Sequence, residues 1–322
     1  MMNNMTRKEI ESILMKNDST LLSFPERGPW GDNKYRGNCS GWIHAFLIWK
    51  YQVNKMAELF AGGGTGYDVC KDMNITYVGA DLNPNPVRPG IIQTNAIEDD
   101  VPEAFLGSDM IFMHPPYGAE IHIPYAGHMY ADPTNTLSKS DLGQMPWSQF
   151  IKELNTIIMK YYAAMDTGAR MSILMGDVRR NGLHSMLTDI VKPGTLEQII
   201  IKEQHNCESN KTYYANKNFV PLAHEYILIL KKISPYIINF QMSKEYRIDI
   251  RDSSTATWRD VINSVICKIG KETSFSLEEV YSEIEGHKKC ETNPHWKEKI
   301  RQILQQDKHY VNIKRGIWAM VA

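Results

Sequence analysis

Apolar and polar positions alternate along the first two thirds of the chain in blocks that predict strands and helices in turn. Short apolar runs bounded by turn residues are typical of buried strands, and longer runs with apolar positions three and four apart indicate helices. We expect strands at 53–60, 76–80, 91–93, 108–113 and 169–175, and helices at 42–51 and 147–165. This order predicts an α/β, doubly wound, Rossmann-like sheet with its ligand crevice at the carboxyl ends of the strands.

Two further apolar runs, 196–203 and 222–231, predict an antiparallel hairpin that completes the sheet at its edge. The stretch between them is rich in Asn, Lys and Tyr, side chains that suit phosphates and stacked bases. Lys211, Tyr213 and Tyr214 are therefore candidate contacts to a nucleic acid. An exposed hairpin loop of no function explains the same residues equally well.

The tail of the chain has a different pattern. Amphipathic helices are expected from Trp258, from Leu277 after the N-cap Ser276, and from Trp296, followed by a hairpin that turns at 314–316. Three helices and a hairpin resemble a winged helix, a module that binds DNA in some proteins and serves dimerisation or protein binding in others. Its candidate phosphate contacts are Lys297, Arg301, Lys314 and Arg315.

A glycine-rich turn follows the first predicted strand. The apolar run ends at Phe60, and Gly62, Gly64 and Thr65 then lead into a predicted helix. Glycine permits unusual backbone angles and close approach of a ligand. The spacing matches neither a Walker A loop nor GxGxxG. Asp81 ends the second strand, where a carboxylate can accept both hydroxyls of a ribose, so the pattern indicates a nucleoside-containing cofactor.

The strand at 108–113 runs directly into His114-Pro115-Pro116-Tyr117. With the turn from Phe60, this corner resembles the S-adenosylmethionine-dependent methyltransferases that modify exocyclic amino groups of DNA bases. Their catalytic motif is Asp, Asn or Ser followed by Pro-Pro-Tyr, and both motifs occur here in the family's order. His114 departs from the family at the first position, which leaves open whether the target is adenine or cytosine.

The resemblance implies S-adenosyl-L-methionine as cofactor and a Rossmann-like methyltransferase sheet. It implies that His114 and the carbonyl of Pro115 accept hydrogen bonds from the two amine protons. It also implies that Tyr117 stacks on the face of a flipped base. The implied cofactor-binding residues are Tyr35, Gly37, Asn38, Glu58, Phe60, Gly62, Gly64, Thr65, Asp81 and Asn95. Residues 35–41 either close over the methionine end of the cofactor or form a strap across the sheet edge. Residues 118–144 form either a lid that orders around the target base or a surface loop.

The length of the chain suits two domains. We expect a methyltransferase domain at 1–232, with the strap and cofactor loop at 1–52, then a linker at 233–255 and a winged-helix-like, α+β domain at 256–322. Arg179 and Arg180 follow a strand at the carboxyl edge and either contact phosphates or are merely solvated. The net charge of −1 counts mildly against DNA as substrate.

No apolar run is long enough to span a membrane, and the N-terminus shows no secretion signal. The five cysteines form no Cys-x-x-Cys pair, and the histidines show no metal-ligand spacing. We therefore expect a cytoplasmic protein of a bacterium or phage that needs no metal.

The leading hypothesis is a site-specific DNA methyltransferase that acts on adenine N6 in preference to cytosine N4. DNA is its expected partner, with a cognate restriction endonuclease as a further candidate, and the protein is expected to be a monomer or a homodimer. One alternative is an RNA-base or protein methyltransferase of the same fold. The other is a catalytically silent cofactor-binding module with a DNA-binding or regulatory role.

Overall fold

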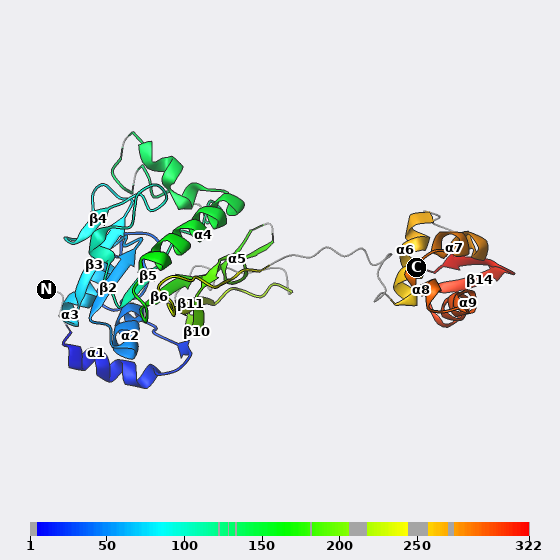
Figure 1. The fold of residues 1–322 in the computed structure, drawn as a ribbon, viewed down its shortest axis with the longest axis horizontal. Helices are drawn as coiled ribbons and strands as arrows, with labels where there is room; N and C mark the ends of the chain where they lie inside the picture. The colour runs from blue at the N-terminus through cyan, green and yellow to red at the C-terminus, as the bar shows by residue number, and fades with distance from the viewer. Residues whose placement is uncertain are drawn as a thin grey trace. The chain divides into compact units, whose positions relative to one another are not determined.

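The computed structural model describes residues 5–121, 123–127, 129–132, 134–180, 182–205, 218–243, 257–269 and 274–321. The chain divides into two compact units, Met1–Ser243 and Lys244–Ala322 (Figure 1). Each unit has its own hydrophobic core, and each is described by itself below.

An eight-stranded sheet forms the centre of the first unit, in the order β1-β10-β11-β6-β5-β2-β3-β4. Its strands are β1 (Leu21–Leu22), β2 (Lys55–Leu59), β3 (Thr76–Asp81), β4 (Ile91–Gln93), β5 (Met110–Met113), β6 (Arg170–Met175), β10 (Thr195–Glu203) and β11 (His224–Lys231). The strands β4, β3, β2, β5 and β6 are parallel, and β11 is antiparallel to both of its neighbours. The predicted α/β, Rossmann-like sheet with an antiparallel hairpin is confirmed.

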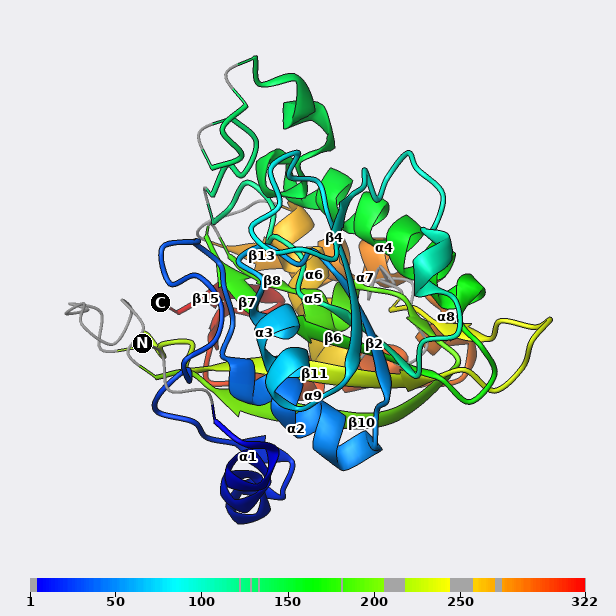
Figure 2. The ribbon, with the colours of Figure 1, turned by 90° about the vertical axis from the view of Figure 1, so that its left-hand side faces the viewer.

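Helices cover both faces of this sheet. The helices α1 (Arg7–Leu14), α2 (Gly41–Tyr51) and α3 (Thr65–Asp72) pack on one face, and α4 (Trp147–Ala164) packs on the other. Figures 1 and 2 show α4 on one side of the strands and α1 and α2 on the opposite side. Successive strand residues point to opposite faces, so Met56 packs with the α2 cluster and Ala57 with the α4 cluster.

The period of the apolar positions explains why α4 is a helix. Its buried residues are Phe150, Leu154, Ile157, Ile158, Tyr161 and Tyr162. These residues are three or four positions apart, or adjacent, and therefore form one continuous stripe toward the sheet. The helix α2 is apolar on most of its circumference and is buried along most of its length, which fits its place between the sheet and α1.

Several short elements complete the first unit. They are the 3₁₀ helices η1 (Met15–Asn17), η2 (Glu103–Phe105), η3 (Thr136–Ser140) and η4 (Leu142–Gln144), the helix α5 (Met186–Asp189), and the strands β7 (Asp177–Arg179), β8 (Leu183–Ser185), β9 (Lys192–Pro193) and β12 (Phe240–Gln241). The pairing of β12 with β9 attaches the first part of the predicted linker 233–255 to the first unit. Residues 244–255 of that linker lie outside the described part of the chain.

The second unit is a small α+β fold. It contains α6 (Trp258–Ile269), α7 (Leu277–Ile284), α8 (Lys288–Glu291) and α9 (Trp296–Gln306), with β13 (Phe275–Ser276), β14 (Tyr310–Lys314) and β15 (Ile317–Met320). The three strands form one sheet in the order β13-β15-β14. The helices and the hairpin lie where the sequence predicted them, and the assignment to a winged helix stays a prediction.

A capping box fixes the start of α7. The hydroxyl of Ser276 accepts from the backbone N–H of Glu279 at 3.2 Å, and the Glu279 carboxylate accepts from the N–H of Ser276 at 2.9 Å. We expect Ser276→Ala to destabilise the second unit by about 1 kcal/mol, because the N–H of Glu279 loses its acceptor and the Glu279 carboxylate loses the hydroxyl donor. Hydrogen exchange of the α7 amides measures this effect. The matched control is Thr6→Ala, which removes the same box from α1 and should leave α7 protected.

None of the helices within the described residues is both long and apolar enough to cross a membrane.

Candidate active site

The glycine turn between β2 and α3 has an unusual backbone. Phe60, Gly62 and Gly64 all have positive φ, at 64°, 46° and 73°. A large side chain such as that of Phe60 rarely adopts this region, and the surrounding structure must hold it there. A Cβ atom on Gly62 would lie 3.0 Å from the ring of Tyr35, so glycine permits the close packing at this point.

Asp81 ties the end of β3 to this turn. Its Oδ2 accepts from the N–H of Gly62 at 2.8 Å, and its Oδ1 accepts from the N–H of Asn83 at 2.9 Å. Burial raises the pKa of this carboxyl group against the lowering effect of those two hydrogen bonds. Each carboxylate oxygen has a further lone pair, so Asp81 can still accept hydrogen bonds from a ligand.

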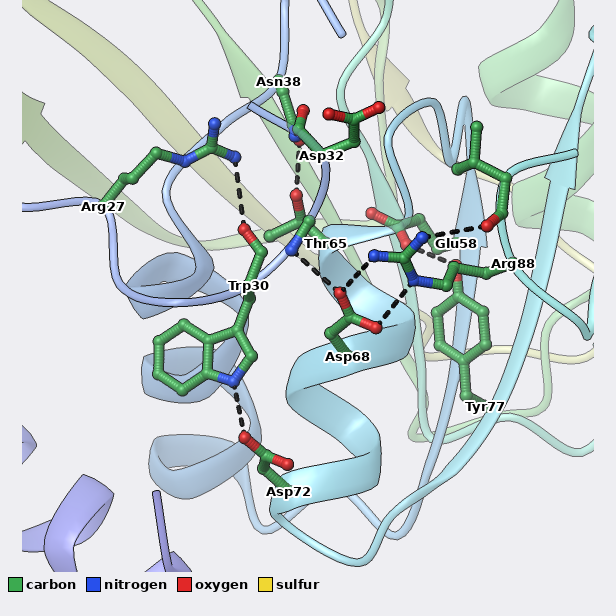
Figure 3. A network of polar contacts seen from close by, with 12 residues as sticks. Arg27, Trp30, Asp32, Asn38, Glu58, Thr65, Asp68, Asp72, Tyr77 and Arg88 are labelled. Carbon is green, nitrogen blue, oxygen red and sulfur yellow. Dashed lines mark hydrogen bonds and ion pairs between the residues drawn. The ribbon is translucent and has the colours of Figure 1, made fainter. Parts of the chain in front are cut away.

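The loop before α2 is fastened to α3 (Figure 3). The indole N–H of Trp30 donates to Asp72 at 2.9 Å, and the N–H of Gly31 donates to Asp68 at 2.9 Å. Arg88 donates to both oxygens of Asp68, at 2.9 and 3.0 Å. These contacts place the loop beside the glycine turn, where the hydroxyl of Thr65 donates to Asn38.

A cavity of about 620 Å³ lies between this loop, the glycine turn and Asp81. Of the predicted cofactor residues, it is lined by Tyr35, Gly37, Asn38, Glu58, Phe60, Gly62, Thr65 and Asp81. Gly64 lies at the N-cap of α3. Asn95 donates a hydrogen bond to Ser140, which lines the cavity. Neither Asn95 nor Gly64 is itself a lining residue of the described cavities.

Part of the segment predicted as a lid lies over this cavity. Tyr125 and Tyr130 are buried and line the cavity, and the ring of Tyr125 stacks on that of Tyr35 with centroids 6.1 Å apart. Asp141 accepts from the N–H groups of Tyr125 and Ala126 at 2.8 and 2.9 Å. The segment therefore has its own hydrogen-bonded structure, and Tyr125 also lines the second cavity described next.

A second cavity, of about 1100 Å³, adjoins the first. The residues that line both are Gly37, Asn38, Cys39, His114, Pro116 and Tyr125. Pro115 and Tyr117 line the second cavity, so the His-Pro-Pro-Tyr corner lies where the two cavities meet. The hydroxyl of Tyr117 lies 3.2 Å from Nε2 of His114 and donates to Glu225 Oε1 at 2.9 Å.

A buried cysteine, histidine and glutamate also lie beside the corner. His44 Nε2 lies 2.7 Å from Glu58 Oε1, and His44 Nδ1 lies 4.0 Å from the sulfur of Cys39. Burial opposes a charge on His44, but Glu58 and Cys39 outweigh it and raise its pKa to about 10. Burial likewise opposes a thiolate at Cys39, but the charge of His44 and hydrogen bonds with His114 and His44 lower its pKa to about 6.

Cys39 should therefore be largely a thiolate at neutral pH, which is the nucleophilic form of a cysteine. We expect the rate of its alkylation by iodoacetamide to rise with a midpoint near pH 6, about two units below the ordinary thiol value. Mass spectrometry of the peptide that contains Cys39, after timed exposure at a series of pH values, gives this midpoint. A midpoint above pH 8 would show that His44 does not lower the pKa of Cys39.

Of the predicted nucleic-acid contacts of the first unit, Arg179 and Arg180 lie outside both cavities. Arg179 donates to the carbonyl of Val220 at 2.7 Å, and its guanidinium lies 4.9 Å from the centroid of the Phe219 ring. Arg180 donates to the carbonyl of Glu120 at 3.3 Å. The other candidates of this unit, Lys211, Tyr213 and Tyr214, are outside the described residues.

In the second unit, Lys297 and Arg301 both lie on α9. The Lys297 ammonium is 5.3 Å from the centroids of two aromatic rings, and Arg301 forms an ion pair with Glu298 at 2.8 Å. Lys314 and Arg315 are exposed at the turn between β14 and β15. These four residues remain candidates for contact with phosphates.

Sequence reasoning missed four residues of the site: Cys39, His44, Lys202 and Glu225. The hairpin offered a signal for the last two, because Lys202 and Glu225 are direct cross-strand partners in β10 and β11. That signal depends on the register, which the long connection between the strands leaves undefined in the sequence. Within the described chain, no group of three or more His, Cys, Asp or Glu side chains is arranged to hold a metal ion.

No protein-family model matches the sequence, and the comparison with curated proteins found no match. Several solved structures are distantly similar. TrmN from Thermus thermophilus is 12% identical over 62% of this chain and 50% of its own, with a TM-score of 0.38. This chain therefore spans half the length of that protein.

An S-adenosylmethionine-dependent methyltransferase from Archaeoglobus fulgidus is 13% identical over 59% of this chain and 93% of its own, with a TM-score of 0.30. The N-methyltransferase NodS from Bradyrhizobium japonicum, in complex with S-adenosyl-L-homocysteine, is 12% identical over 71% and 99%, with a TM-score of 0.33. Likeness at this level gives no information on substrate or residue roles. The strand order and pairing show an α/β, Rossmann-like sheet that is mixed with an antiparallel hairpin.

Proposed function

We propose that this protein transfers a methyl group from S-adenosylmethionine to an exocyclic amino group of a flipped DNA base, with adenine N6 favoured over cytosine N4. One observation carries the proposal. The His114 to Tyr117 corner lies at the junction of two cavities, one built like a nucleoside site and the other open to a second reactant.

The residues of the first cavity fit the cofactor. Its lining combines aromatic rings with a few polar groups, as small-molecule sites do. Asp81 offers carboxylate oxygens to ribose hydroxyls, and a small apolar hollow adjoins it, lined by Leu59, Phe60, Leu82, Ala96 and Leu142 among others. These apolar side chains suit contact with an adenine ring. The tyrosine rings at 35, 125 and 130 suit a sulfonium, since aromatic faces attract cations. When bound, the cofactor supplies an electrophilic methyl group on a good leaving group.

The corner supplies what a base amine needs. The lone pair of such an amine is delocalised into the ring, so acceptors for its two protons favour the tetrahedral nitrogen that attacks a methyl group. Neutral His114 and the carbonyl of Pro115 are suitable acceptors, and the ring of Tyr117 offers a stacking face. The base must flip out of the DNA duplex to reach these groups, and the second cavity is large enough for a purine.

Incubation with unmethylated DNA and S-adenosylmethionine, followed by digestion and mass spectrometry of the nucleosides, tests the proposal. A new N6-methyladenine or N4-methylcytosine peak would support it and identify the target. RNA and a protein extract are treated in parallel. If RNA or protein is methylated while DNA is unmodified, the proposed DNA substrate is wrong. If calorimetry shows that the cofactor binds but no product is methylated, the proposed enzymatic function is contradicted.

A further inference from the structure

The side chains behind the corner form a chain of hydrogen bonds that ends at His114. Lys202 Nζ donates to Glu225 Oε2 at 2.5 Å, Tyr117 donates to Glu225 Oε1 at 2.9 Å, and the Tyr117 oxygen lies 3.2 Å from His114 Nε2. Glu225 and Lys202 face each other across β11 and β10, so the sheet fixes the first link. A Cβ on Gly176 would lie 3.3 Å from both Glu225 and Tyr117, which shows how closely both pack on the end of β6.

The direction of these hydrogen bonds follows from the charge of Glu225. Burial opposes the charge, but the ammonium of Lys202 and the hydrogen bonds from Lys202 and Tyr117 hold the pKa of Glu225 below its ordinary value. An ionised carboxylate only accepts hydrogen bonds. Burial and the neighbouring Glu225 raise the pKa of Tyr117, so its hydroxyl keeps the proton that it donates to Glu225. The Tyr117 oxygen can therefore act only as a hydrogen-bond acceptor toward His114.

We propose that Lys202, Glu225 and Tyr117 are positioning residues that hold neutral His114 in its Nε2–H tautomer, so that Nδ1 is the atom that accepts a hydrogen bond from the substrate. The Tyr117 oxygen can only accept from His114, which requires the proton on Nε2. The role in catalysis rests on the proposed function, and the tautomer itself does not. Cys39 is the other titratable group that faces the ring.

Nitrogen NMR of the full-length protein with ¹⁵N-labelled histidine tests the tautomer directly, without substrate. The ring signals of His114 are assigned by their absence in His114→Gln. At about pH 8, above the ordinary titration range of imidazole, we expect a protonated Nε2 and an unprotonated Nδ1. A ring with the proton on Nδ1, or one protonated on both nitrogens, would overturn the proposal.

Three variants test whether the chain of hydrogen bonds sets the tautomer. Tyr117→Phe removes the acceptor but keeps the ring, and Glu225→Gln removes the charge. Each should give a mixture of the two tautomers at His114. Cys39→Ala should leave the Nε2–H form unchanged. An unchanged tautomer in both Tyr117→Phe and Glu225→Gln, or its loss in Cys39→Ala, would contradict the assignment. Tyr117→Phe provides the test even if Glu225→Gln does not fold.

The kinetic test compares Glu225→Gln with Glu197→Gln. Glu197 lies on the same strand as Lys202 and pairs with Arg170 away from both cavities. We expect kcat to fall about tenfold or more in Glu225→Gln with KM for the cofactor nearly unchanged, since general base catalysis is worth ~10²–10⁴-fold. Glu197→Gln should behave as the wild type. If the His114 ring is in the Nε2–H form but no base is methylated, the tautomer assignment holds and the proposed function is refuted. If a base is methylated and the ring is in another form, the function holds and the tautomer assignment is refuted.

Discussion

His114→Ala is expected to lower kcat for methyl transfer by about 100-fold or more while cofactor affinity stays within about twofold. The alanine removes the acceptor that the amine protons need, but the contacts of the glycine turn and Asp81 are left in place. Titration calorimetry with S-adenosylmethionine measures the affinity, and the yield of methylated nucleoside gives the rate. Full activity of the alanine variant would show that the corner is only structural.

Two further histidine variants sharpen this test. His309→Gln, in the second unit, is the matched control, because this exposed side chain pairs with Asp307 and lines neither cavity. His114→Asn keeps an acceptor oxygen and should retain measurable activity. The wild type should lose turnover at acid pH, where a charged imidazole no longer accepts a hydrogen bond. The asparagine variant should lack that acid limb, and identical profiles for the two proteins would contradict His114 as the acceptor.

Asp81→Ala is expected to weaken S-adenosylmethionine binding by about 100-fold, which corresponds to roughly 3 kcal/mol. The alanine removes a charged acceptor for ribose hydroxyls and also frees the N–H groups of Gly62 and Asn83, which fix the floor of the cavity. Calorimetric titration of the folded variant gives the dissociation constant, and circular dichroism confirms that the sheet is intact.

Asp109→Ala is the matched control for this change. Asp109 accepts from the N–H groups of Asn54 and Lys55 at 2.7 and 3.0 Å, just before β5 and so at the opposite end of the parallel strands. Its removal should lower stability without changing cofactor affinity. If Asp81→Ala binds the cofactor like the wild type, or if both variants lose affinity equally, Asp81 does not contact the ribose.

The central strands, α2 and α4 were predictable because each buries a regular pattern. β5 is apolar throughout and buried, as expected of a strand covered on both faces, and α4 repeats its apolar positions at helical spacing. The turns were predictable for a similar local reason. Gly62 and Gly64 adopt backbone angles that glycine favours, and Ser276 caps α7.

Tertiary structure alone decided how the site is completed, because residues distant in sequence meet there. The loop at 23–40 contributes Cys39, α2 contributes His44, and the hairpin contributes Lys202 and Glu225. Periodicity shows which face of a strand is buried, but not which residue of another element lies opposite it.

The sheet, its helices and the two motifs could be predicted from the amino-acid order, since they depend on local pattern and on residues fixed by turn geometry. The tertiary structure decided the junction of two cavities at His114, the buried pair of Cys39 and His44, and the chain of hydrogen bonds from Lys202. Burial and proximity create these arrangements, because they shift the pKa values and set the direction of each hydrogen bond.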